Sequence, residues 1–122
     1  MFDLKLSRET LLPSPKVVMV SLVGEVEFTN GLQAEQFFDR MLQEDQPRHV
    51  ILDLSGLTFA SSVFFSALLF WRDELTRREG RLVLYGLSPE IASTMRILGL
   101  DRVLTICPDQ PSALDALSRT GS

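Results

Sequence analysis

The chain has 122 residues, of which 45% are hydrophobic and 23% are charged, and its formal net charge is -4. This composition is typical of a folded domain and excludes the polar, highly charged class of disordered chains. The acidic balance argues against nucleic acid as a partner, because phosphate backbones attract basic surfaces. The single cysteine, Cys107, excludes an intramolecular disulfide and a multi-cysteine metal site, and it favours a reducing compartment.

The apolar runs are all shorter than the roughly 18 residues that a membrane-spanning helix requires. The start, "MFDLKLSRETLLPSP", carries charges and has no apolar run of signal-peptide length. We therefore expect a cytoplasmic protein with no direct membrane insertion, folded as a single domain over residues 1–122.

The first part of the chain predicts two strands and a helix. "FDLKLS" alternates apolar and polar residues like a half-buried strand, and the valine-rich "KVVMVSLVGEVE" is typical of a central strand. Residues 32–43 place Leu32, Phe37 and Met41 on one side at helical spacing, with Phe38 and Leu42 as further candidates for that side. Thr29 or Asn30 is the candidate cap of this helix, and the proline at position 47 ends it.

A second buried strand, "HVILDLSG", precedes the long helix "SSVFFSALLFWRDELTRREG". Gly80 stands in the usual position for a left-handed helix end. The apolar positions of this helix predict a buried stripe that consists of Phe64, Leu68, Trp71 and Leu75.

The remaining residues predict a strand at "RLVLYGL", a helix from Ser88 to Gly99, a short strand at "RVLTIC" and a final helix begun by Ser112. Helices alternate with strands after the first two strands. This order predicts an α/β fold with a mostly parallel four- to five-stranded sheet and about four helices.

The sequence contains few of the residue patterns that are typical of an active site. His49 has no histidine or cysteine nearby, so we expect a surface loop residue rather than a metal ligand. "FASSV" lacks the glycines of the "GxSxG" nucleophile motif, and neither "GxxxxGK[ST]" nor "GxGxxG" occurs. Cys107 has no CxxC partner and is expected to be an inert thiol. We predict a non-enzymatic protein with no cofactor and no metal.

Two adjacent serines, Ser61 and Ser62, lie between the second buried strand and the long helix. One hydroxyl is expected to cap the helix by accepting an amide hydrogen bond, which contributes about 1 kcal/mol. A phosphate on the other would be stabilised by the same amides. A capping serine and a phosphorylated serine can lie side by side at this junction. The spacing of Ser61 and Ser62 does not show which of them has which role.

Three segments together resemble the STAS domain family of anti-sigma factor antagonists and sulfate transporter domains. They are "VVMVSLVGEVEFTNGLQAEQF", "VILDLSGLTFASSVFFSALL" and "GRLVLYGLSPEIASTMRILGLDRVL". The resemblance implies a regulatory module that binds an anti-sigma factor with serine kinase activity and is switched by phosphorylation. On this chain the acceptor is Ser61, with Ser62 as the alternative. Ala60 replaces the family's aspartate before the serine pair, Val63 its glycine, and Glu27 the aspartate of "GELD".

The expected partner surface surrounds this junction and the "EVEFTN" loop, and it comprises Glu27, Thr29, Asn30, Ser61, Ser62, Val63 and Phe65. Phe65 belongs either to this surface, where it would be exposed, or to the core.

Two alternatives remain. One is a STAS scaffold without phosphorylation, in a signalling or transporter assembly, which Ala60 and Val63 favour. The other is a small-ligand or nucleotide-binding domain with a pocket at the carboxyl ends of the parallel strands. The sequence leaves the oligomeric state open.

Overall fold

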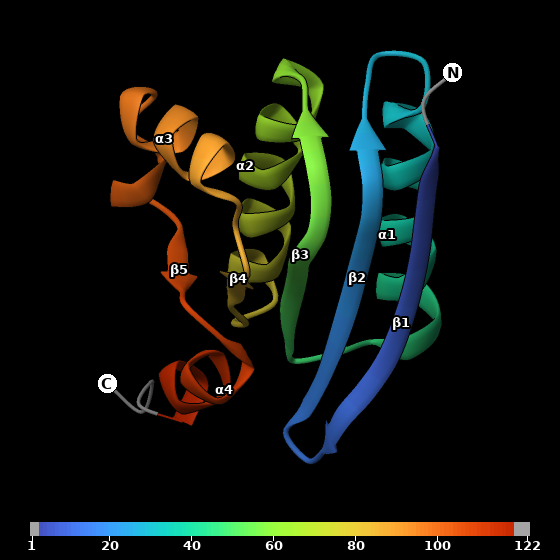
Figure 1. Ribbon diagram of the computed structural model, residues 1–122. Helices are drawn as coiled ribbons and strands as arrows, with labels where there is room; N and C mark the ends of the chain where they lie inside the picture. Colours follow the sequence, from blue (N-terminus) through green and yellow to red (C-terminus); the bar gives the residue numbers. More distant parts are fainter. Residues whose placement is uncertain (1–2, 119–122) are drawn as a thin grey trace.

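The computed structural model describes residues 3–118, in which one sheet is flanked by helices (Figure 1). The elements in chain order are β1 (Leu4–Pro13), β2 (Lys16–Val26), α1 (Gly31–Asp45), β3 (His49–Ala60), α2 (Ser62–Arg77), β4 (Leu82–Tyr85), α3 (Pro89–Ile97), the short 3-10 helix η1 (Leu100–Arg102), β5 (Thr105–Cys107) and α4 (Gln110–Ser118). Among these described residues, no helix is long and apolar enough to cross a membrane.

The sheet has five strands in the order β1-β2-β3-β4-β5. β1 pairs with β2 in antiparallel fashion, whereas each later pair of neighbours is parallel. Parallel neighbours need a crossover connection, and α1, α2 and α3 supply the three crossovers. The predicted α/β fold with a mostly parallel sheet is therefore confirmed.

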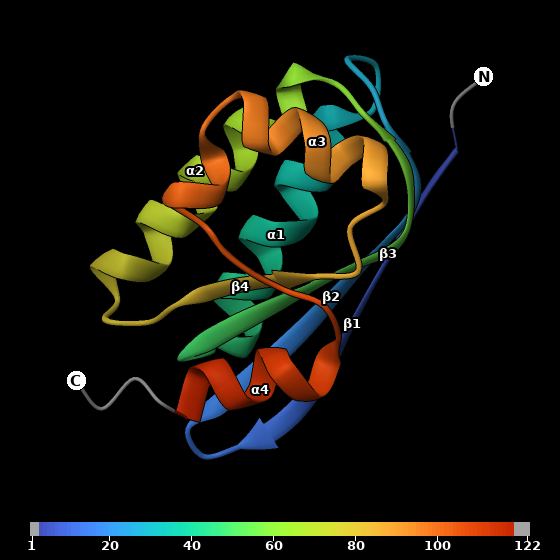
Figure 2. The same ribbon diagram turned by 60° about the vertical axis from the view of Figure 1, so that its left-hand side comes forward.

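The helices cover the two faces of the sheet unequally. Figure 2 shows α1, α2 and α3 on one face and α4 alone on the other. The larger core cluster lies between the sheet and the first three helices, and it contains the predicted stripe of α2. Its aromatic centre is a stacked pair, Phe38 and Trp71, with ring centroids 4.4 Å apart. A smaller cluster around Ile51 and Val83 lies under α4.

The predicted buried face of α1 is partly wrong. Leu32 is 63% exposed, whereas Met41 is fully buried. The buried positions are Gly31, Ala34, Phe38, Met41 and Leu42, and the last four follow the spacing i, i+4, i+7 and i+8 of one helical face. The further candidates Phe38 and Leu42 are thus buried as predicted. Leu32 lies two positions before Ala34, roughly 200° around the helix, and therefore points to solvent.

The end of α2 differs from the prediction for Gly80. The left-handed residue is Glu79, with φ 61°, and Gly80 follows it. The Gly80 N–H donates to the Leu75 carbonyl at 2.7 Å, which completes a Schellman-type end. A Cβ on Gly80 would lie 1.8 Å from the Arg48 carbonyl oxygen. Glycine is needed here because another backbone passes so close.

The last two helices begin differently. Ser88 caps α3 as predicted, since its hydroxyl accepts from the Ile91 N–H at 3.2 Å, and Gly99 is left-handed after the last turn. α4 begins earlier than predicted, at Gln110. The Asp109 carboxylate accepts from the Ser112 N–H at 2.9 Å, so Asp109 replaces Ser112 as the cap.

The prediction of a surface loop position for His49 is wrong. His49 begins β3, is 7% exposed, and its Nδ1 accepts a hydrogen bond from the Arg81 N–H at 3.0 Å. Burial, together with the charges of Arg48 and Arg81, lowers the pKa of this imidazole. His49 therefore joins β3 to the start of β4 as a neutral acceptor.

Candidate functional site

The serine pair lies at the beginning of α2, where β3 ends. Ser61 is the N-cap residue, with extended backbone at φ -85° and ψ 176°, and Ser62 is the first residue of the helix. The Ser61 N–H donates to the Val26 carbonyl at 2.9 Å, which extends the pairing of Ala60 with Val26. The predicted position of both serines is confirmed, and the end of β2 holds it.

The predicted capping hydrogen bond is absent for Ser61. Its side chain makes no cap hydrogen bond, and its Oγ is buried with no partner among the described residues. The neighbouring Ser62 is exposed. A buried hydroxyl without a partner is costly, because the group loses its water and gains nothing in return. Ser61 is thus fixed by its backbone, and its hydroxyl is left unused.

The loop from Glu27 to Asn30 follows Val26 and lies next to Ser61. Asn30 closes this loop, since its Oδ1 accepts from the Glu27 N–H at 2.7 Å and its Nδ2 donates to the Glu25 carbonyl at 2.9 Å. Glu27 accepts from the Phe28 N–H at 3.1 Å, and Thr29 is exposed. Asn30 therefore holds the loop in shape, and Thr29 and Phe28 project from it.

The starts of α1 and α2 touch. A Cβ on Gly31, the first residue of α1, would lie 2.4 Å from Cγ1 of Val63. The bulk of Val63 is accommodated because position 31 is glycine. The structure thus brings together six of the seven residues predicted for the partner surface, which are Glu27, Thr29, Asn30, Ser61, Ser62 and Val63. Asn30 is itself buried, and it contributes by holding the loop.

Phe65, the seventh, is only 7% exposed and packs in the larger core cluster. The interpretation of Phe65 as a surface residue is therefore wrong, and its core alternative is right. Its ring lies edge-on to Phe64, with centroids 5.8 Å apart. Phe65 points inward because α2 packs against both the sheet and neighbouring helices. This double packing enlarges the buried face of α2.

A shallow groove of about 540 Å³ runs along the opposite side of the start of α2. Its lining consists of Phe28 and Glu35 with the α2 residues Ser62, Val63, Ser66, Ala67 and Phe70. Phe28 is 72% exposed and Phe70 is 54% exposed. We call this set the serine groove. Sequence reasoning missed Phe28 and Phe70, although Ser62, Ser66 and Phe70 recur every four residues and so share one face of α2.

The cysteine gives little support for a catalytic role. Burial, with a contribution from Asp109, raises the pKa of the Cys107 thiol, which makes this cysteine a poor nucleophile.

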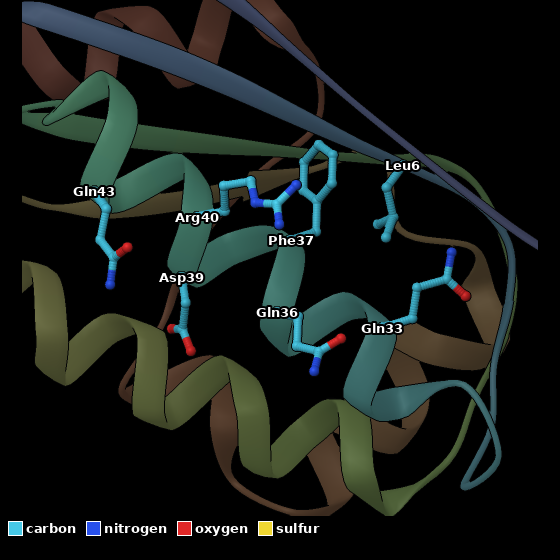
Figure 3. Close-up of a pocket in the computed structure, with 7 residues that line it drawn as sticks. All are labelled: Leu6, Gln33, Gln36, Phe37, Asp39, Arg40 and Gln43. Carbon is cyan, nitrogen blue, oxygen red and sulfur yellow. The ribbon is translucent and has the colours of Figure 1, made fainter.

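A concavity of about 590 Å³ lies between β1 and the outer side of α1, lined by residues such as Leu6, Phe37 and Arg40 (Figure 3). This concavity does not adjoin the carboxyl ends of the parallel strands, where the small-ligand alternative expected a pocket. The serine groove does adjoin them, since Phe28 follows β2 and Ser62 follows β3.

Comparison with known proteins defines the class. The model of the STAS domain matches residues 11–113, so the chain belongs to the STAS domain family. An anti-sigma factor antagonist from Mycobacterium paratuberculosis has a similar structure, with a TM-score of 0.79, 23% identity, and coverage of 93% of this chain and 95% of that chain.

Two further solved structures have the same fold. One is the Bacillus cell fate determinant SpoIIAA in the phosphorylated form, with a TM-score of 0.63, 20% identity, and coverage of 95% of this chain and 98% of that chain. The other is a chain of the stressosome, a signal integration and transduction hub. It has a TM-score of 0.63, 20% identity, and coverage of 90% of this chain and 96% of that chain.

Proposed function

We propose that this chain is a regulatory protein of the anti-sigma factor antagonist kind, cytoplasmic and non-enzymatic, that binds an anti-sigma factor with serine kinase activity. Membership of the STAS family and the similar fold of an anti-sigma factor antagonist support this proposal. The observation that carries it is the serine groove, where exposed aromatic side chains adjoin Ser62, the neighbour of Ser61. Exposed aromatic residues are frequent anchors of protein interfaces.

The proposed switch is phosphorylation of Ser61. A phosphate adds nearly two negative charges, and the buried environment of the Ser61 Oγ has no room to solvate them. The modified side chain must therefore turn outward, over the serine groove. There it would bring charge and bulk onto a surface that otherwise presents Phe28, Val63 and Phe70, and it would weaken partner binding.

A second candidate is a STAS scaffold that binds its partner without a switch. Two observations favour it: the Ser61 Oγ is buried, so a kinase could not reach it without local movement, and Ala60 and Val63 depart from the family pattern at its neighbours. Both candidates use the serine groove. They differ in whether a charge at position 61 matters.

The test begins with this chain as bait in a lysate of its source cells, which identifies the partner. The purified partner is then titrated with the wild type and with Ser61→Asp, and the wild type is incubated with partner and ATP. We expect Ser61→Asp to weaken binding by at least about tenfold, in the range of a charge placed in a desolvated interface. Intact mass should show one phosphate on the wild type and none on Ser61→Ala.

Ser118→Asp is the matched control, because it adds the same charge on α4, which lies across the sheet (Figure 2). It should bind like the wild type. If Ser61→Asp also binds like the wild type and no phosphate is gained, the switch is refuted and the scaffold function stands. If no partner binds through the serine groove, both candidates fail.

A further inference from the structure

β1 is a long edge strand with no further strand on its outer side among the described residues. Figure 1 shows it at the margin of the sheet, with α1 behind it. An open edge of this length presents backbone N–H and C=O groups that can pair with another strand. Charged residues, bulges and covering loops usually blunt such edges, so the means by which β1 is protected is informative.

Two hydrogen bonds show which residues of β1 face outward. The Asp3 carbonyl faces β2, since it accepts from the Glu25 N–H at 2.9 Å. The Leu4 carbonyl faces away from β2, since it accepts from Nε2 of Gln33 on α1 at 3.4 Å. Direction alternates along a strand, so the backbone groups of Leu6 and Arg8 also point outward.

The part of β1 that pairs regularly with β2 is short, and a single residue lies at its centre. Its pairing with β2 runs without interruption from Leu4 to Thr10, and the register shifts between Thr10 and Leu12. Ser7 is the midpoint of this stretch. Two copies of the stretch that pair in antiparallel fashion use its full length only when Ser7 faces Ser7 of the second copy.

The charges fit this one arrangement. With Ser7 on the two-fold axis, Lys5 faces Glu9 of the second copy, and Glu9 faces its Lys5. Both side chains are exposed, and neither forms a salt bridge with another described residue. A parallel pairing would set Lys5 against Lys5. The charges of the edge are therefore complementary to those of its own antiparallel copy.

The other face of β1 supports the same contact. Arg8 is bound to Glu44 and Asp45 at the end of α1, at 2.5 Å and 3.4 Å, and this pairing raises the pKa of Arg8 and keeps its charge away from the edge. Leu6 and Phe37 are half-buried and face each other across the concavity between β1 and α1 (Figure 3). In the pairing about Ser7, Leu6 faces Arg8 of the second copy, and the Leu6 side chains of the two copies are diagonal neighbours.

We propose that the β1 edge is a homodimer interface, in which two chains pair antiparallel about Ser7 and their sheets become continuous. The serine groove lies at α2, beneath other strands, and stays accessible. This proposal is thus independent of the proposed function.

The first test is sedimentation of the full chain over a wide range of concentration. The wild type should show reversible dimerisation. Lys5→Glu and Glu9→Lys should each weaken the dimer about tenfold, because each creates two like-charge pairs. The double variant Lys5→Glu/Glu9→Lys should recover it. A monomer at all concentrations, or a dimer indifferent to both single changes, would overturn the proposal.

The second test fixes the register by disulfide trapping in a Cys107→Ser background. Ser7→Cys should cross-link readily, since non-hydrogen-bonded antiparallel neighbours lie about 4.5 Å apart at Cα, within disulfide range. Lys5→Cys alone should not, because its copies would lie more than about 13 Å apart. Equal cross-linking of both variants would refute this register. Unchanged thermal unfolding of each variant is the control for folding.

Discussion

Ser61 and Ser88 occupy the same position at the start of two helices, with similar extended backbone, yet they use their hydroxyls differently. The Ser88 hydroxyl accepts from the Ile91 N–H, whereas the Ser61 hydroxyl has no partner among the described residues. The backbone of Ser61 is held instead by the Val26 carbonyl. The two serines therefore form a natural pair for separating a structural hydroxyl from one that is free for another use.

Ser88→Ala should lower the free energy of unfolding by about 1 kcal/mol, the usual loss for an N-cap. Ser61→Ala should leave it unchanged or raise it slightly, because it removes a buried polar group that has no hydrogen bond. Urea denaturation of both variants measures the difference. An equal loss in both would mean that the Ser61 hydroxyl caps α2 in solution.

At the scale of an element, the end of α2 depends on two adjacent residues with opposite requirements. Glu79 adopts the left-handed conformation that favours glycine, while Gly80 is confined by the Arg48 carbonyl. Glycine is therefore one position later than backbone conformation alone would place it. The close approach of the chain before β3 explains the offset.

Gly80→Ala should destabilise the protein by about 1–3 kcal/mol, because the added methyl group overlaps the Arg48 carbonyl and forces the backbone to move. Glu79→Gly should be neutral or stabilise it by up to about 1 kcal/mol, because it relieves the left-handed conformation. Thermal unfolding of the two variants is the measurement. A harmless Gly80→Ala would show that the loop before β3 can withdraw.

The order and type of the elements could be predicted from the sequence because these depend on local patterns, such as the stripe of α2 or the cap at Ser88. Two of the errors have tertiary causes, since the surroundings of His49 and Gly80 are decided by backbone from another part of the chain. Leu32 differs because it lies roughly 200° around α1 from Ala34 on the buried face. At the site, the helix start identified Ser61 and Ser62. The choice between Phe65 and Phe70 as the exposed ring required the packing of α2 between sheet and helices.

At the scale of the whole molecule, that packing leaves one side of α2 open beside the loop that follows β2. The open side carries Phe28 and Phe70 next to the serine pair, and the covered side carries Phe65. Aromatic residues of the same kind thus have two separable roles. One side would serve recognition of the proposed partner, and the other serves stability.

Phe28→Ala and Phe70→Ala should each weaken binding of the proposed partner by about 1–3 kcal/mol, as expected for aromatic anchors, with little change in the free energy of unfolding. Phe65→Ala should instead destabilise the fold by about 3–5 kcal/mol, because it leaves a cavity in the larger core cluster. Ile97→Ala is the control, since Ile97 is 81% exposed on α3, outside the serine groove. Calorimetric titration with the partner and urea denaturation measure the two effects separately. If Ile97→Ala weakened binding while Phe28→Ala and Phe70→Ala did not, the partner would bind at the end of α3, and the serine groove would lose its role.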